Sequence, residues 1–402
     1  MLVSQDYTDL MQYNQQVYRM VRTDTGAMWG FFTIYREPET AWTGLAYRKD
    51  LAEKAGYTGE PVTLADWEAL LQAFKDSGVA VPLAFPQQGY TFYGEFASAF
   101  DAYPGLYAEN GETVKFGFIE NGFRDYLKLM SDWREKGYIL SNFVDWDADN
   151  NGAAYMGFIT QDAYCTDEVG ASMTVFSFNK AQMVGMGLAQ SPDYYRQATC
   201  LPRQTEDQII HLGSGITYAS ALPLAIATTC EDIELAIRFC DFLYTRQGFE
   251  YANYGVEGVT FNYDENGEPV STDLLLHNEN GYNYDSYKFA DWCWRVGLYT
   301  NLQSKEMQPD PTIYDVSDIW GEGYDAAWVI PTGITLTAEE TEEYSSRYSD
   351  IQTYVAESIP KFIMGELNLD SDWDSFVASV KTMGIEHCCE IYQGAVARYN
   401  AR

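Results

Sequence analysis

The clearest alternation of apolar and polar positions lies between residues 219 and 270. An apolar run from Leu222 to Ile226 predicts a strand. A helix is expected directly after it, with the pair Thr228-Thr229 at its N-cap. Apolar residues then recur at intervals of three and four, which predicts one buried stripe of a helix. The stripe consists of Ile233, Ala236, Ile237, Cys240, Leu243 and Tyr244.

The pattern after this helix changes from helical to hairpin spacing. A short second helix is predicted around residues 249–254, and Gly255 and Gly258 then mark a tight turn. The run Phe261-Asn262-Tyr263 leads into Asp264-Glu265-Asn266-Gly267, a strong hairpin signal. The expected order is therefore strand, helix, helix, turn and hairpin.

Segments nearer the start of the chain show the same mixture. Residues 2–21 form a loosely amphipathic pattern that predicts one helix, followed by a turn at 23–26 and a strand at 28–32. Thr63 with Asp66 resembles a capping box at the start of a helix that Gly78 closes. These elements favour an α/β fold.

Three further elements follow in the next part of the chain. Residues 81–85 read as a short buried strand, and the sequence around Asn110-Gly111 reads as a hairpin. A helix is predicted over 123–136, with Gly137 as its stop.

The composition describes an acidic globular chain. Its 402 residues are enough for two or three domains, and its 46% apolar and 21% charged residues are ordinary for a globular protein. No window approaches the roughly 18 consecutive apolar residues of a membrane span. The net charge of -34 would repel nucleic acid, so we expect neutral or cationic ligands. Abundant Tyr, Phe and Trp supply flat rings on which sugar faces can stack.

Residues that could carry chemistry give no catalytic or metal motif. The nucleophile, zinc-protease and phosphate-loop patterns are absent from the sequence, and His211, His277 and His387 are interpreted as structural or surface residues. The alternating acids from Asp145 to Asp149 resemble a calcium loop, but Asn150 replaces the expected glycine, so a solvated acidic loop is favoured. We predict no cofactor and no metal.

The cysteines are interpreted as mostly buried, small apolar residues. They form no C-x-x-C pair, and their odd number argues against a disulfide framework. They are Cys165, Cys200, Cys230, Cys240, Cys293, Cys388 and Cys389.

Several short motifs occur in an order that is informative. Tyr254 to Gly258 reads Y-G-V-E-G, and Tyr47 to Asp50 reads Y-R-K-D. Residues 133–139 read W-R-E-K-G-Y-I, residues 361–366 read K-F-I-M-G-E, and residues 391–399 read I-Y-Q-G-A-V-A-R-Y. In this order they resemble the extracellular solute-binding proteins of ABC sugar importers, family 1, in the lipoprotein-like branch. The layout is similar to that of maltose-binding protein.

This resemblance implies a two-lobed α/β fold of the periplasmic-binding-protein type II, with a hinge and an interlobe cleft. It places residues 1–36 and 219–285 in the N-terminal lobe, and residues 45–212 and 300–402 in the C-terminal lobe. Hinge crossings are expected at 37–44, at 213–218 and at about 286–299. A helix like that at 2–21 follows further strand-helix units in the family, so we expect a truncated N-terminal lobe.

The resemblance also implies a set of ligand-binding residues. Aromatic rings would stack on sugar faces, while hydroxyl groups would hydrogen-bond to sugar hydroxyls. For the rings the alternative is packing under the hinge or in the core, and we interpret Glu95 and Glu257 as solvated or structural. The expected set is Tyr35, Trp42, Tyr90, Tyr93, Phe178, Ser214, Tyr218, Trp292 and Trp294.

The function implied is capture of a carbohydrate, an oligosaccharide, for import, without catalysis. The partners would be the carbohydrate and the permease subunits of an ABC transporter, with the protein acting as a monomer and no nucleic acid involved. The location would be extracellular or at the cell surface, lipid-anchored in the full-length protein, although this sequence begins without a signal peptide. The alternative is a glycoside hydrolase or another carbohydrate-active enzyme, because acids and aromatic rings serve both. A structural or adhesion protein would predict repeats, which the sequence lacks.

Overall fold

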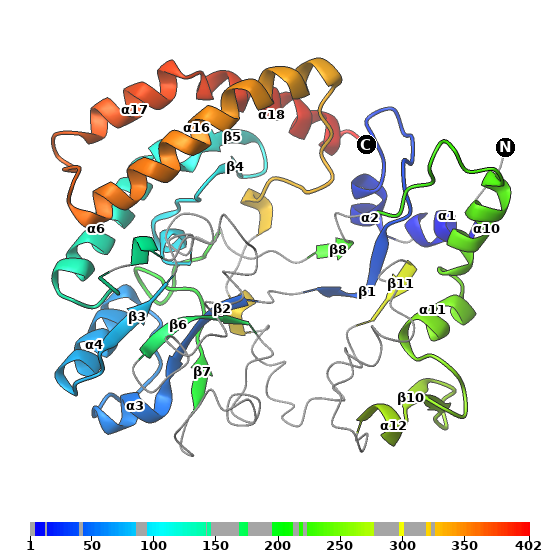
Figure 1. Ribbon diagram of the computed structural model, residues 1–402, viewed down its shortest axis with the longest axis horizontal. Coiled ribbons are helices and arrows are strands. Elements are labelled where there is room, and N and C mark those ends of the chain that lie inside the picture. Colours follow the sequence, from blue (N-terminus) through cyan, green and yellow to red (C-terminus); the bar gives the residue numbers. More distant parts are fainter. Residues whose placement is uncertain are drawn as a thin grey trace.

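The computed structural model describes residues 5–12, 14–39, 43–85, 95–141, 143–145, 169–175, 195–211, 217–219, 223–276, 297–300, 319–322 and 326–402. Figure 1 shows that these residues form two lobes of unequal size, and the passage from β1 (Thr33–Glu39) to β2 (Thr43–Arg48) joins them. The mixed α/β fold in two lobes agrees with the expectation from the sequence.

The larger lobe is built on a mixed sheet in the order β3-β6-β2-β7. β3 (Val81–Ala84) runs parallel to β6 (Val169–Val175), whereas β2 is antiparallel to both β6 and β7 (Arg196–Ala198). β2, which enters from the other lobe, therefore lies inside the sheet. The crossing is thereby tied to the centre of the larger lobe.

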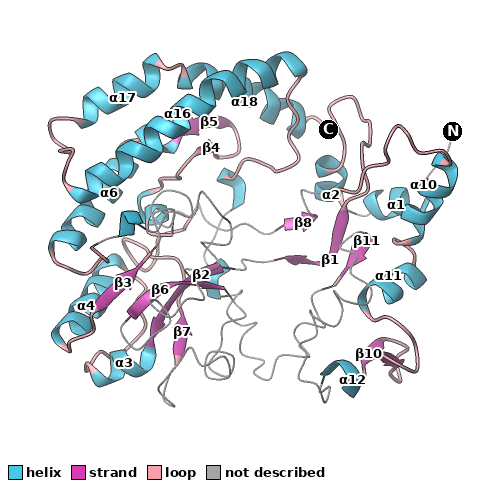
Figure 2. Ribbon diagram, in the orientation of Figure 1, coloured by secondary structure: helices cyan, strands magenta, loops and turns pink. Residues whose placement is uncertain are grey.

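Figure 2 shows helices beside and above this sheet, with the hairpin of β4 and β5 next to α18. α16 packs against α6 and α18, and α4 packs against β3. The remaining elements of the lobe are α3 (Lys49–Lys54), α4 (Leu64–Asp76), η1 (Ala97–Phe100), β4 (Leu106–Glu109), β5 (Thr113–Phe116), η2 (Gly117–Ile119), α6 (Asn121–Glu135), η3 (Phe143–Asp145), η5 (Ala326–Trp328), α16 (Ala338–Met364), α17 (Trp373–Thr382) and α18 (Ile385–Asn400).

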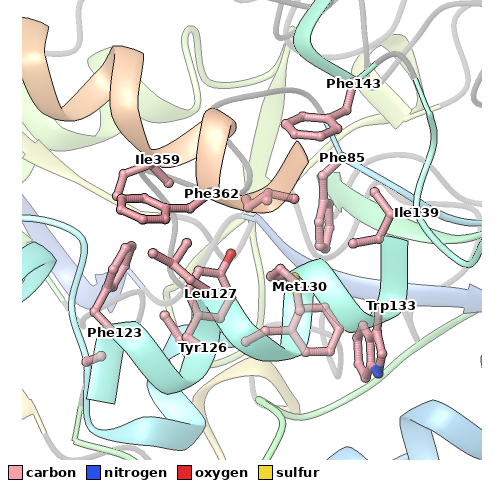
Figure 3. Packing of buried hydrophobic residues seen from close by; sticks show 14 of the residues in the cluster. Phe85, Phe123, Tyr126, Leu127, Met130, Trp133, Ile139, Phe143, Ile359 and Phe362 are labelled. Carbon is pink, nitrogen blue, oxygen red and sulfur yellow. The ribbon is translucent and has the colours of Figure 1, made fainter. Parts of the chain in front are cut away.

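The core of the larger lobe is a continuous apolar cluster. Its centre is the inward stripe of α6, whose residues recur at intervals of three and four. Burial of each such side chain contributes about 2 to 3 kcal/mol. Figure 3 shows the stripe facing α16, with the side chains Phe123, Tyr126, Leu127, Met130, Trp133, Ile359 and Phe362 packed together.

The smaller lobe contains a short sheet in the order β11-β1-β8. β1 is parallel to β11 and antiparallel to β8, with an irregular register along β8. The other elements are α1 (Gln5–Gln12), α2 (Gln15–Met20), β8 (Thr217–Ala219), α10 (Ile233–Phe242), α11 (Arg246–Asn253), β9 (Phe261–Tyr263), β10 (Pro269–Ser271), α12 (Asp273–Leu276) and β11 (Gly297–Tyr299). A small cluster around Tyr7, Val17, Val21, Phe32, Ile34 and Tyr244 forms its core.

Asn253, at the end of α11, forms side-chain hydrogen bonds with backbone groups on the edge of β11 that faces away from β1. Its Nδ2 donates to the Leu298 carbonyl at 2.9 Å, and its Oδ1 accepts from the Thr300 amide at 3.2 Å. The Leu298 amide donates to the Leu243 carbonyl. Asn253 is fully buried, so these bonds are shielded from water.

The region that gave the clearest sequence pattern differs in part from the prediction. Of the strand expected at 222–226, the described residues 223–226 form one bridge, between Leu224 and Phe31. Pro223 has no amide hydrogen to extend a ladder, and it packs against Gly30. The N-cap of α10 is Asp232, whose side chain accepts from the Leu235 amide, and Thr228-Thr229 forms a turn instead.

Two other predictions near the start were wrong in extent. The single helix expected over 2–21 is split, because Asn14 starts α2 by accepting from the Gln16 and Val17 amides. The strand expected at 28–32 is limited to isolated bridges at Met28 and Phe31, and the regular strand begins at Thr33.

Most other local predictions are confirmed. The capping box of Thr63 and Asp66 begins α4, and Gly78 follows this helix with a φ of 88°. Asn110 and Gly111 both have positive φ in the tight turn between β4 and β5. The hairpin at 261–271 forms as β9 and β10. In the part of the chain that the structure describes, no helix is long and apolar enough to cross a membrane.

Candidate functional site

Of the side chains predicted to bind ligand, the structure describes Tyr35 and Tyr218. Tyr35 lies on β1, and its ring meets that of Tyr299 on β11 edge to face at 5.9 Å. Tyr218 lies on β8 and packs against the core of the smaller lobe. The others lie outside the described residues: Trp42, Tyr90, Tyr93, Phe178, Ser214, Trp292 and Trp294.

Tyr35 lines a cavity of about 530 Å³ in the smaller lobe. Elements distant in sequence form its wall, since α2, β1, α11, β10 and β11 all contribute. Val17, Ile34, Phe249, Pro269 and Leu298 supply apolar surface, while the polar members are Asn14, Tyr35, Arg36, Arg246, Glu250 and Glu268.

The charged residues of this cavity are paired. Arg246 Nε donates to Glu250 Oε1 at 2.9 Å, and the Tyr263 hydroxyl donates to Glu250 Oε2 at 2.7 Å. The hydrogen bond with Glu250 raises the pKa of both Arg246 and Tyr263. This network holds the Glu250 carboxylate in one orientation.

A second pair of charged side chains also lines the cavity. Arg36 lies 3.9 Å from Glu268, and its guanidinium sits over the Phe249 ring at 5.4 Å. The two arginines and two glutamates that line the cavity have a net charge of zero. A cavity with apolar walls and balanced charges suits a neutral, polar ligand that has one apolar face.

The sequence interpretation selected Tyr35 but missed the other members of this cavity. Arg246 and Glu250 have the i,i+4 spacing of a helical ion pair, which is a detectable signal. Arg36, Phe249 and Glu268 carry no local signal, because tertiary contacts bring them together.

Trp320 is a further residue that the sequence interpretation missed. It is 3% exposed, and its Nε1 donates to the Leu45 carbonyl of β2 at 2.9 Å. Its ring covers Gly44, where a Cβ atom would lie only 2.4 Å from the ring. Trp320 therefore fixes the start of β2, directly after the crossing between the lobes.

Glu95 is a buried acid in the larger lobe. It is 4% exposed, and its Oε2 has no hydrogen-bond partner among the described residues. Burial raises the pKa of Glu95 to about 8, so the side chain is mostly uncharged at neutral pH. Burial, and then the nearby Glu95, raises the pKa of Tyr103 and Tyr126. Glu95 is thus structural rather than solvated, whereas Glu257 is exposed.

The described residues contain no cluster of His, Cys, Asp and Glu that could hold a metal ion. Most of the acidic run at 145–149 lies outside them. His387 is on the surface, 2.6 Å from Glu343. The described cysteines carry free thiols. Cys240 and Cys388 are buried, as expected, whereas Cys200, Cys230 and Cys389 are half-buried.

Comparison with known proteins adds a family match. The sequence model described as bacterial extracellular solute-binding protein matches residues 8–248, more than half of the chain. No curated protein matches the chain in sequence.

Solved structures with the same fold cover nearly the whole chain. An HMO-binding solute-binding protein associated with an ABC transporter, from Bifidobacterium longum infantis, shares 14% identity with a TM-score of 0.77, over 98% of this chain and 82% of that one. Alginate-binding protein AlgQ2 shares 20% identity with a TM-score of 0.70, over 98% and 79%. The S. pneumoniae protein FusA in complex with kestose shares 16% identity with a TM-score of 0.70, over 99% and 81%. At these identities the likeness establishes the fold alone.

Proposed function

The chain belongs to the family of bacterial extracellular solute-binding proteins, and we propose that it captures an oligosaccharide for an ABC importer. The family match over residues 8–248 is the observation that carries the proposal. The structural neighbours named above support the carbohydrate class, since their names specify alginate, HMO and kestose. The permease subunits of the importer would be its partners, and the protein would act as a monomer.

The ligand would bind between the lobes, and hinge closure would exclude water from it. We propose the domain boundaries given by the sequence, with residues 1–36 and 219–285 in one lobe and 45–212 and 300–402 in the other. Tyr35 supports a contribution from the smaller lobe, because it lines a cavity of suitable chemistry. The other aromatic and hydroxyl residues expected from the sequence complete the proposed site.

The protein would bind without converting its ligand, and it would act outside the cytoplasm. The family is one of extracellular binding proteins, which supports both statements. Anchoring at the cell surface by a lipid is part of the same proposal.

A ligand panel tests this function directly. The purified chain would be melted with mono- and oligosaccharides, because a ligand that binds only the folded state raises the melting midpoint. Tyr35→Ala should weaken binding about tenfold if the ring stacks on the sugar. Tyr251→Ala is the matched control, since Tyr251 is an exposed tyrosine of the same lobe outside the cavity.

The outcomes separate the functional classes. A saturable shift with one sugar class and no product on long incubation supports the binding protein. A shift accompanied by cleavage of the sugar would instead show a glycoside hydrolase. A cooperative melt that no sugar shifts would contradict the carbohydrate class.

A further inference from the structure

A charged cluster joins the two lobes away from the β1 to β2 passage. Asp24 lies in the tight turn at 23–26 of the smaller lobe, where Gly26 has a φ of 78°. Its carboxylate accepts from Arg398 Nε at 2.7 Å and from Arg402 Nε at 2.9 Å. Arg398 lies in the last turn of α18, and Arg402 follows this helix, which packs in the larger lobe and ends beside α2 in Figure 1.

Arg402 also holds the end of α2. Its Nη1 donates to the carbonyl of Arg19, in the last turn of α2, at 2.8 Å. The same atom donates to the carbonyl of Arg22, which follows the helix. The same atom donates to the Gly333 carbonyl of the larger lobe at 2.7 Å. The side chain is only 4% exposed. A buried guanidinium with so many acceptors is strongly fixed, and it complements the negative end of the helix dipole.

Arg398 extends the cluster into the larger lobe. It forms two parallel bonds with Glu340, at 3.0 and 2.7 Å, and Glu340 is part of the capping box that begins α16. Burial alone would raise the pKa of Asp24 and of Glu340. Hydrogen bonds from Arg402 and Arg398 outweigh it and lower the pKa of Asp24, and hydrogen bonds from Arg398 and the Thr337 amide lower the pKa of Glu340. The carboxylates are therefore charged at neutral pH.

Backbone of the larger lobe also approaches α2 closely. A Cβ atom at Gly333 would lie 2.5 Å from Met20 Cα, so only glycine allows this approach. Thr332 Oγ1 lies 3.8 Å from Met20 Sδ. The neighbouring Ile330 and Ile334 pack against the buried cluster of Ala108, Val114 and Val396, which shows that this segment is part of the larger lobe.

We propose that Asp24, Arg398 and Arg402 form an interlobe anchor, which fixes the placement of the lobes and so sets the affinity of the sugar site. The effect of the interlobe anchor on sugar affinity rests on the proposed function. Lobes that bind one ligand between them bind it only in certain relative placements, so a contact that favours one placement changes the apparent affinity.

Interlobe distances test the anchor without any ligand. Fluorophores attached through non-natural amino acids at Tyr251 of the smaller lobe and Glu357 of the larger lobe would report energy transfer between the lobes. Asp24→Asn and Gly333→Ala should each alter the distribution of transfer efficiency. Asp370→Asn is the control, because it removes an exposed ion pair with Arg124 inside the larger lobe.

A sugar titration of the same variants tests the influence on the site. Asp24→Asn should change the apparent Kd by about fivefold or more, whereas Asp370→Asn leaves it unchanged. Arg398→Gln should reproduce the effect, and melting curves identify any variant that fails to fold.

Distances that are identical in all variants would overturn the anchor. Altered distances with an unchanged Kd would overturn its influence on the site. A native chain that binds no sugar would refute the proposed function and that influence together, while the distance measurement would still decide whether the anchor exists.

Discussion

The two lobes differ in how their apolar residues are used. In the larger lobe, α6 buries one complete stripe against α16, and the cluster extends through α4 and α17. In the smaller lobe, α10 buries Cys240, and Leu243 at its C-cap is also buried, but Leu235 is 63% exposed and Ile233 is 47% exposed. The larger lobe is therefore stabilised mainly by its own core. The smaller lobe depends more on individual polar contacts, such as those of Asn253 and of the interlobe anchor.

The largest effect is expected from the core of the larger lobe. Phe123→Ala should lower the free energy of unfolding by about 4 kcal/mol, because it removes a buried ring and leaves a cavity. Phe242→Ala of α10 is the control, since this ring is 36% exposed and should cost much less. Urea unfolding measures both. If both substitutions lowered the free energy of unfolding equally, the larger lobe would not depend more on its apolar core than the smaller lobe does.

Glu95 should make the larger lobe sensitive to pH. Its pKa is about 8 in the folded protein against 4.5 as the reference, so the folded state holds a proton that the unfolded state loses. The stability contributed by Glu95 is complete below pH 4.5 and is lost as the pH rises to 8. The loss by pH 7 should reach about 3 kcal/mol.

Glu95→Gln should remove this dependence, because the amide does not titrate. Unfolding free energies of both proteins from pH 5 to pH 8 provide the measurement. If the difference between them is constant over this range, the buried acid does not titrate as described.

A single polar side chain should matter in the smaller lobe. Asn253→Ala leaves the Leu298 carbonyl and the Thr300 amide without these partners, which should cost about 2 kcal/mol. Asn266→Ala, in the exposed turn between β9 and β10, is the control. Amide hydrogen exchange at Thr300 gives a local readout, and unchanged exchange would show that β11 does not depend on Asn253.

The smallest effect is expected at a helix end in the larger lobe. Thr63→Ala removes the cap of α4 and should cost about 1 kcal/mol, whereas Thr63→Ser should restore most of it. Thermal unfolding compares the variants. If Thr63→Ala cost more stability than Asn253→Ala, individual polar contacts would matter more in the larger lobe than in the smaller one, contrary to the comparison above.

Caps, turns and helix ends that depend on residues adjacent in sequence could be predicted from the sequence. The capping box of Thr63, the turn at Asn110-Gly111 and the stop at Gly137 follow from local backbone chemistry, and the structure has all three. Ile233 was expected in the buried stripe of its helix but is exposed. Periodicity identifies which face is apolar, but only the fold decides how much of it another element covers.

The candidate site was less predictable for the same reason. Tyr35 was identified through its likeness to a family pattern, whereas Arg36 and Glu268 meet across more than two hundred residues of sequence. Asp24 and Arg402 lie even further apart along the chain. Pairings of this kind are set by how the lobes pack, and a single sequence carries no local trace of them.

The position of Asn253 has a consequence for how copies of the protein behave at high concentration. A strand at the edge of a sheet can recruit a strand from another chain, which is a common start of aggregation. At β11 the Leu298 and Thr300 groups are already occupied by a side chain of the same molecule. An incoming strand would have to displace Asn253 first, so this edge is protected against intermolecular sheet growth.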